Sequence, residues 1–195
     1  MKRIFLPTLV AFAALLRVWM APLPNIEPIL VFTLTCSLAF GPITGFLFAF
    51  LSMLFSDILM GSVGIWTLYT SGSYGLVGFL AGLFFMKRKN PSRREMTLLS
   101  IGLIILYDLI TAVCFALTFF IPIEVALINQ IPFTILHLSN CIVVFLFYPG
   151  IVKLSSFMKN TTLHNNRIIC YSLNQNFKKL RESKFLSIFM FSDHK

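Results

Sequence analysis

The sequence predicts an all-α membrane protein, a bundle of six transmembrane helices with both termini in the cytoplasm. Composition is the first reason: of 195 residues, 57% are hydrophobic and 12% are charged, which is too apolar for a soluble domain of this length. The distribution of charge is the second. All but one of the 16 Lys and Arg residues lie in three clusters separated by long apolar stretches: Lys2 with Arg3, residues 87–94, and the segment from Lys153 onward.

These basic clusters also predict the orientation of the chain. Lys and Arg close to a membrane helix resist translocation, so short loops rich in them stay in the cytoplasm. An even number of crossings must therefore separate each cluster from the next. The hydropathy accommodates four crossings before Lys87 and two after Arg94, as in a multi-pass protein of the plasma membrane. The net charge of +9 does not indicate a nucleic-acid partner, because the basic residues flank apolar spans instead of forming a stripe with exposed aromatics.

The first predicted span covers residues 4–20, since a helix needs about 20 apolar residues to cross the bilayer. Its basic start and Ala11-Phe12-Ala13 also resemble a signal peptide, although Pro7 and the short apolar core favour a span. The later spans are predicted at 26–40, 43–59, 68–86, 97–120 and 133–151.

The connections alternate between the two sides of the membrane. Outer loops are expected at the Pro-rich segment 21–25, at the Gly-rich segment 60–67 and at 121–132, which has two prolines. Inner connections are expected at Gly41-Pro42 and in the basic hairpin 87–94. Residues 1–152 are thus predicted to form the transmembrane domain and 153–195 a basic cytoplasmic tail. Within the tail, the amphipathic piece 177–191 suits either the inner leaflet or disorder.

Small residues predict close packing of the third and fourth spans. Gly45, Ala49, Ser52 and Ser56 repeat on one helical face, and Gly78 with Gly82 forms a GxxxG pair. Small side chains let helix backbones approach closely in lipid. A docking face for another membrane subunit is a second interpretation, compatible with the first.

Enzyme and metal motifs are missing from the sequence. It has no HExxH, GxSxG or GxGD motif and no P-loop, so we expect neither an enzyme nor a chain that itself uses ATP. The four cysteines form no CxxC pair, and three lie in apolar segments, so they are read as buried apolar residues. No cofactor and no metal site are predicted.

Three polar residues lie at depths where the bilayer should reject them. Asp108 is near the middle of the fifth span, where a carboxylate costs about 2.5–3.5 kcal/mol on insertion scales. His137 and Asn140 are three residues apart in the last span and share a helical face. A ligand contact is the favoured interpretation for Asp108, whereas His137 also fits a hydrogen-bonded core histidine and Asn140 a contact between helices.

A second polar group lies near the outer ends of the first three spans. Arg17 is the only cation outside the three clusters, and Glu27 and Asp57 lie near the same level. They fit either an interfacial ion pair or a ligand site. Trp66 and Tyr69 fit an interfacial aromatic belt individually. Taken together, these residues suggest a pocket that opens to the outside.

Several short motifs, in their order and spacing over residues 4–152, resemble one family of membrane proteins. The motifs are PNIEP at 24–28, FGPITG at 40–45, SDILMG at 56–61, GIWT at 64–67, YDL at 107–109, and PFT at 132–134 followed by His137 and Asn140. They are similar to the substrate-binding S components of energy-coupling factor (ECF) transporters. One feature departs from that family, which often has Ala-x-x-x-Ala on the first helix as its docking face. Here Ala11 is followed four residues later by Leu15, and Ala14 by Val18.

The resemblance implies high-affinity binding of a vitamin or related micronutrient, taken from outside and held in the outer half by later helices under outer loops. It also implies a membrane scaffold subunit with two cytosolic ATPases as partners, and release of substrate inward by toppling. The expected substrate-binding residues are Glu27, Trp66, Tyr69, Asp108, His137 and Asn140. Trp66 and Tyr69, with the glycines Gly61, Gly64 and Gly72, are expected to form a lid.

Two other functions stay open at this point. A stand-alone secondary transporter or channel could use Asp108 and His137 as a proton relay. The absence of an inverted repeat and of paired broken helices speaks against it. An intramembrane enzyme would need a nucleophile and a base in reach of each other, and the sequence shows no such pair.

Overall fold

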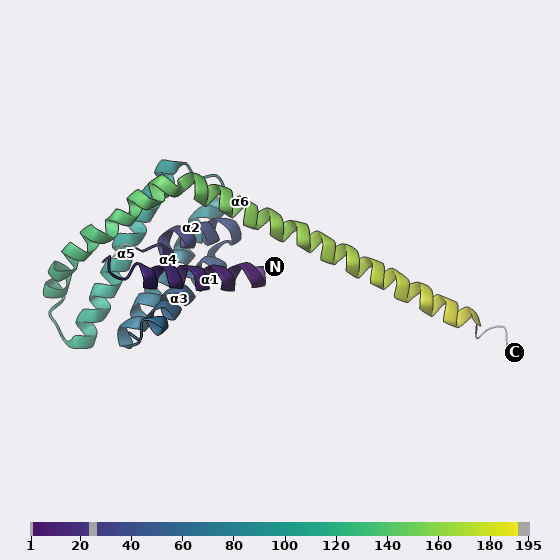
Figure 1. Ribbon diagram of the computed structural model, residues 1–195, viewed down its shortest axis with the longest axis horizontal. Coiled ribbons are helices and arrows are strands. Elements are labelled where there is room, and N and C mark those ends of the chain that lie inside the picture. The colour runs from purple at the N-terminus through teal and green to yellow at the C-terminus, as the bar shows by residue number, and fades with distance from the viewer. Residues whose placement is uncertain (1, 24–26, 191–195) are drawn as a thin grey trace.

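The protein is described by a computed structural model that covers the backbone of residues 2–23 and 27–190, with side-chain surroundings for residues 6–23 and 27–162. Six α-helices follow one another, and these residues contain no strand, so the all-helical prediction is confirmed. The helices are α1 (Lys2–Trp19), α2 (Ile29–Phe40), α3 (Pro42–Leu59), α4 (Ile65–Lys87), α5 (Arg93–Phe119) and α6 (Ile123–Met190). Figure 1 shows a bundle along which the first part of α6 packs, while its last part runs away from the bundle.

Four helices are long and apolar enough to cross a membrane: α3, α4, α5 and the part of α6 between Ile123 and Thr162. The apolar part of α1 and the whole of α2 are shorter. With 12 residues, α2 is about 18 Å long, less than the hydrocarbon thickness of about 30 Å. Apolar residues occur all around this helix, and seven of its twelve residues are buried. It packs against α3, α4 and α6. Six crossings therefore remain a prediction, with α2 shielded by its neighbours.

The closest helix contact lies between α3 and α4, where small residues were predicted to pack. A Cβ atom added to Gly45 would overlap the backbone of Gly78, and one added to Gly78 would overlap that of Gly45. Ser37 donates a hydrogen bond of 2.9 Å to the carbonyl of Gly78 at the same point. Ala49 and Ser52 on the same face of α3 are fully buried. This face serves packing inside the bundle and is not open to a separate subunit.

The basic hairpin between α4 and α5 is held against α6. Tyr148 Oη donates to the carbonyl of Pro91 at 2.8 Å, and the Arg93 guanidinium lies 4.9 Å from the centre of the Phe145 ring. A capping box begins α5: Ser92 Oγ accepts from the Glu95 amide at 3.2 Å, and Glu95 Oε2 accepts from the Ser92 amide at 2.7 Å. The Gly41-Pro42 turn lies at the same end of the bundle, because Gly82 of α4 packs directly on Pro42.

Two predicted outer loops are wrong in extent. The segment 60–67 was expected to be a loop, but α4 begins at Ile65, so Ile65, Trp66 and Thr67 are helical. The segment 121–132 is almost entirely helix, since Ile121 and Pro122 alone separate α5 from α6. The chain turns there through Phe120 in the left-handed region (φ 54°), and the Ile121 amide closes the end of α5 on the carbonyl of Ala116. The longer loop was predicted from its two prolines. Membrane helices tolerate an internal proline, and Pro132 lies inside α6.

The last helix continues past the predicted end of the transmembrane domain. α6 includes Lys153 and runs to Met190 without an interruption. It also contains Pro149, and Figure 1 shows the ribbon change direction between its two halves, as prolines inside helices often cause. The predicted amphipathic segment 177–191 is therefore helical as far as Met190. Its last residue, Phe191, lies outside the described residues. The division into 1–152 and 153–195 stays a prediction.

Candidate functional site

A cavity of ≈ 380 Å³ lies between α5 and α6, with one side closed by α4 and by the segment that precedes α2. Its walls combine aromatic and aliphatic side chains with seven polar or charged ones, and small-molecule sites likewise join apolar surface to polar groups that orient the ligand. The lining residues are Glu27, Thr70, Tyr107, Asp108, Thr111, Ala112, Phe115, Ile121, Ala126, Asn129, Gln130, Phe133 and His137.

Helical spacing explains why these residues share one cavity. On α5, Thr111 follows Asp108 by three residues and Phe115 follows it by seven, so all three occupy one face. On α6, Phe133 precedes His137 by four residues and thus shares its face. The turn at 121–122 makes α5 and α6 antiparallel neighbours, and it brings these two faces opposite each other.

Asp108 and His137 form a hydrogen bond with each other at the wall of this cavity. His137 Nδ1 lies 3.0 Å from Asp108 Oδ1, and both residues are 4% exposed. The edge of the Tyr107 ring packs on the imidazole, with ring centres 5.3 Å apart. An ionised carboxylate can only accept a hydrogen bond, so with Asp108 ionised Nδ1 is the donor of this pair, while the role of Nε2 depends on the tautomer of the ring.

Three buried polar atoms on the cavity residues have no hydrogen-bond partner within the described part of the chain. They are Glu27 Oε2, Asp108 Oδ2 and His137 Nε2. Buried polar groups are nearly always paired, and each exception needs a reason. Two are carboxylate oxygens, which accept hydrogen bonds, and the third is a ring nitrogen whose role depends on the tautomer. Two residues of the cavity wall therefore have a carboxylate oxygen that a hydrogen-bond donor could still satisfy.

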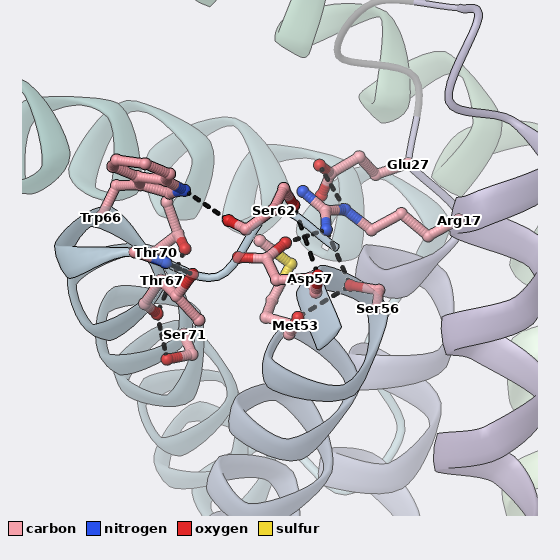
Figure 2. A network of polar contacts seen from close by, with 11 residues as sticks. Arg17, Glu27, Met53, Ser56, Asp57, Ser62, Trp66, Thr67, Thr70 and Ser71 are labelled. Carbon is pink, nitrogen blue, oxygen red and sulfur yellow. Dashed lines mark hydrogen bonds and ion pairs between the residues drawn. The ribbon is translucent and has the colours of Figure 1, made fainter. Parts of the chain in front are cut away.

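Arg17 forms the predicted ion pair at the outer ends of the first helices, and it pairs with both Glu27 and Asp57. Its Nε lies 3.1 Å from Glu27 Oε1, and its Nη1 lies 2.7 Å from Asp57 Oδ1. Nη1 also donates to Ser56 Oγ at 2.7 Å, as Figure 2 shows. The guanidinium thereby joins α1, the end of α3 and the segment before α2.

The other three predicted site residues lie outside the lining of the cavity. Asn140 is buried on α6, and its Oδ1 accepts from the Glu27 amide at 2.9 Å. Trp66 is half exposed, and its Nε1 donates back to the Ser62 carbonyl at 2.9 Å (Figure 2). The hydroxyls of Tyr69 and Thr118 hydrogen-bond each other at 2.7 Å. Contacts of Asn140, Trp66 and Tyr69 with a substrate remain a prediction.

Sequence reasoning overlooked several residues of the cavity wall. Thr111 and Phe115 could have been found by following the face of Asp108 along α5. Asn129 and Gln130 could not, because the sequence was read as a loop where α6 has already begun. Thr70 is the residue that α4 presents to the cavity, next to the predicted Tyr69 but turned by one helical position.

Comparison with known proteins adds one decisive observation. A family model for the S component of ECF-type riboflavin transporters matches residues 8–148, a range that contains every residue of the cavity. The chain belongs to this family. Comparisons with curated proteins and with solved structures give no match.

Membership confirms the resemblance seen in the sequence. An ECF S component is a multi-pass protein embedded in the plasma membrane, where it binds a small vitamin and associates with scaffold and ATPase subunits. The family comprises substrate-binding components of transporters and is not a class of enzymes. The long apolar helices agree with this placement.

Proposed function

We propose that this S component binds riboflavin, or a close flavin relative, in the cavity between α5 and α6 for ATP-driven uptake by its scaffold and ATPase partners. The observation that carries the proposal is a set of three buried atoms that have no partner among the described residues and belong to residues lining one cavity: Glu27 Oε2, Asp108 Oδ2 and His137 Nε2. In this proposal the His137 ring is neutral with its proton on Nδ1, so all three atoms accept hydrogen bonds. The family of the chain supports the choice of vitamin.

The chemistry of a flavin suits these walls. Riboflavin has a flat ring system with an apolar edge, an imide N–H at the opposite edge, and a chain of hydroxyls. Tyr107, Phe115 and Phe133 offer aromatic surface for the ring. The three acceptors can take hydrogen bonds from the imide and the hydroxyls. The volume of ≈ 380 Å³ lies within the range of about 300–1,000 Å³ typical of small-molecule pockets.

The charges near the cavity do not call for a cationic vitamin. Glu27 is paired with Arg17, and Asp108 accepts a hydrogen bond from His137. Each carboxylate therefore already has a partner through one oxygen and offers the other oxygen to a neutral donor. A neutral, hydroxyl-rich ligand leaves these pairs intact.

We further infer six crossings with both termini in the cytoplasm, so that the cavity opens in the outer half of the membrane. The arrangement of the helix ends supports this orientation. Arg17 and Asp57 meet where α1 and α3 end, whereas the basic hairpin 87–94 packs on Tyr148 at the opposite end of the bundle. Lys and Arg favour the cytoplasmic side, so the end with the Arg17 cluster faces outward.

Binding by the purified protein tests the proposal. Riboflavin fluorescence should be quenched on titration with the protein in detergent, to a stoichiometry of one flavin per chain, and native mass spectrometry should show the same complex. Thiamine serves as a cationic control and should not compete. A protein that leaves flavin fluorescence unchanged and carries a different small molecule from the cell would disprove the choice of vitamin.

A further inference from the structure

We propose that Arg17 is a positioning residue for the substrate, because it holds the carboxylate of Glu27, a residue that lines the cavity. The inference rests on the proposed function, since the hydrogen-bond donor that meets Oε2 belongs to the bound vitamin. It assigns to α1 a part in substrate binding, although none of residues 6–19, the part of α1 whose side-chain surroundings are described, lines the cavity.

Glu27 is held from two sides. Arg17 Nε engages Oε1 at 3.1 Å, which leaves Oε2 buried and without a partner among the described residues. The backbone amide of Glu27 donates to Asn140 Oδ1 at 2.9 Å. A side chain from α1 and one from α6 thus fix the carboxylate and the backbone of Glu27, a residue that lines the cavity.

Arg17 is itself held in place by the end of α3. Its Nη1 donates to Asp57 Oδ1 and to Ser56 Oγ, each at 2.7 Å, as Figure 2 shows. Ser56 Oγ in turn donates to the Met53 carbonyl at 2.7 Å, so its lone pairs are left for Arg17. The side chains of Arg17, Glu27 and Asp57 are only 18%, 15% and 6% exposed. Solvent screens such a cluster weakly, and removal of the central cation leaves two carboxylates uncompensated.

The same cluster also holds the connection between α3 and α4. The carbonyl of Asp57 accepts from the Ser62 amide at 3.0 Å, and the Ser62 carbonyl accepts from Trp66 Nε1 at 2.9 Å (Figure 2). A continuous set of polar contacts therefore runs from the carboxylate of Glu27, through Arg17 and Asp57, to the start of α4. Substrate that contacts Glu27 acts on an assembly and not on a single flexible side chain.

A double-mutant cycle with riboflavin as the probe tests this role. Arg17→Met and Glu27→Gln should each weaken binding by about 10- to 100-fold, the range expected for a charge-assisted hydrogen bond. If Arg17 acts through Glu27, the double variant should bind no more weakly than the weaker single variant, because coupled residues are not additive. Arg88→Met is the matched control: Arg88 pairs with Glu95 at the other end of the bundle, is largely exposed, and its loss should leave affinity unchanged.

A second variant covers the case in which Arg17→Met does not fold. Arg17→Lys keeps the charge, but a lysine cannot serve Glu27 and Asp57 together as the guanidinium does. The Arg17→Lys variant should bind riboflavin several-fold more weakly than wild type. The double variant Arg17→Lys with Glu27→Gln should bind no more weakly than Glu27→Gln alone.

The outcomes separate this proposal from the proposed function. Wild-type affinity in Arg17→Met or Arg17→Lys, or losses that add fully to that of Glu27→Gln, would overturn the role of Arg17 and leave the vitamin assignment standing. A wild-type protein that binds no flavin would overturn both.

Discussion

Asp108 and His137 are joined by a hydrogen bond of 3.0 Å between Oδ1 and Nδ1, and this contact links α5 to α6 at the wall of the cavity. The contact gives one oxygen of the Asp108 carboxylate a hydrogen-bond partner, which lowers the cost of placing this group inside the bilayer. It leaves Oδ2 and Nε2 without partners in the described structure, and both belong to residues that line the cavity. A purely structural pair would be expected to use these atoms within the protein.

Asp108→Asn should weaken riboflavin binding by about 1–3 kcal/mol, because an amide presents a donor where the carboxylate presented an acceptor. Thermal stability should change little, since an isosteric amide costs less to bury than a carboxylate. Titration of flavin fluorescence and a melting curve give the two values. Full affinity combined with a clear loss of thermal stability would make Asp108 a structural contact between helices.

Phe133→Ala should weaken flavin binding by about 0.5–1.5 kcal/mol or more through loss of aromatic contact with the ring. Phe133 is 53% exposed and lines the cavity. Phe157→Ala is the control, since Phe157 also lies on α6, is 59% exposed, and lies outside the cavity. Equal flavin affinity in both variants would argue against a ring bound beside Phe133.

Gly78→Ala should lower stability by about 1–3 kcal/mol, because the added methyl group overpacks the contact of α3 with α4. A Cβ at this position overlaps the backbone of Gly45. Gly72→Ala is the matched change on the same helix, with nothing within 4 Å of its Cβ, and should be neutral or slightly stabilising. Melting temperatures of the two variants in detergent compare them directly; similar values would contradict the close crossing at Gly45.

Cysteine labelling of intact cells tests the six-span topology. An impermeant maleimide should reach cysteines placed at Gly61 or Ile123 and should miss those placed at Asn90 or Asn160. Cys36 and Cys141 are buried and should contribute little background. Permeabilised cells provide the control, because Asn90 should then react. Reaction at Asn90 in intact cells would reverse the orientation inferred from the basic clusters.

Transport in proteoliposomes tests the energy source. Riboflavin should bind to this chain alone, but accumulation should require the scaffold subunit, both ATPases and ATP, because the sequence has no nucleotide-binding motif. A proton gradient without the partners should drive no uptake. Accumulation under that gradient, abolished by His137→Gln, would favour the secondary transporter with an Asp108–His137 relay.

The sequence was a good guide wherever a pattern has one physical cause. A carboxylate inside an apolar span needs a partner, and Asp108 has one in His137. Small residues at helical spacing need a close neighbour, and Gly45 meets Gly78. Helix ends were less predictable, because prolines suggest loops in soluble proteins yet are tolerated inside membrane helices. Trp66 was placed in a Gly-rich outer loop by the sequence but lies in the first turn of α4, and the lid stays a prediction.

The sequence by itself determined that the chain is an apolar helical protein with basic ends, and which residues share a face of one helix. These properties follow from composition and from local backbone geometry. Only the tertiary structure decided which faces meet. Neighbouring positions on a helix differ by about 100° around its axis, so the rotation of α4 decides that Thr70 and not Tyr69 lines the cavity. Packing likewise places Arg17 between Glu27 and Asp57, residues 10 and 40 positions away, which no local pattern could have paired with it.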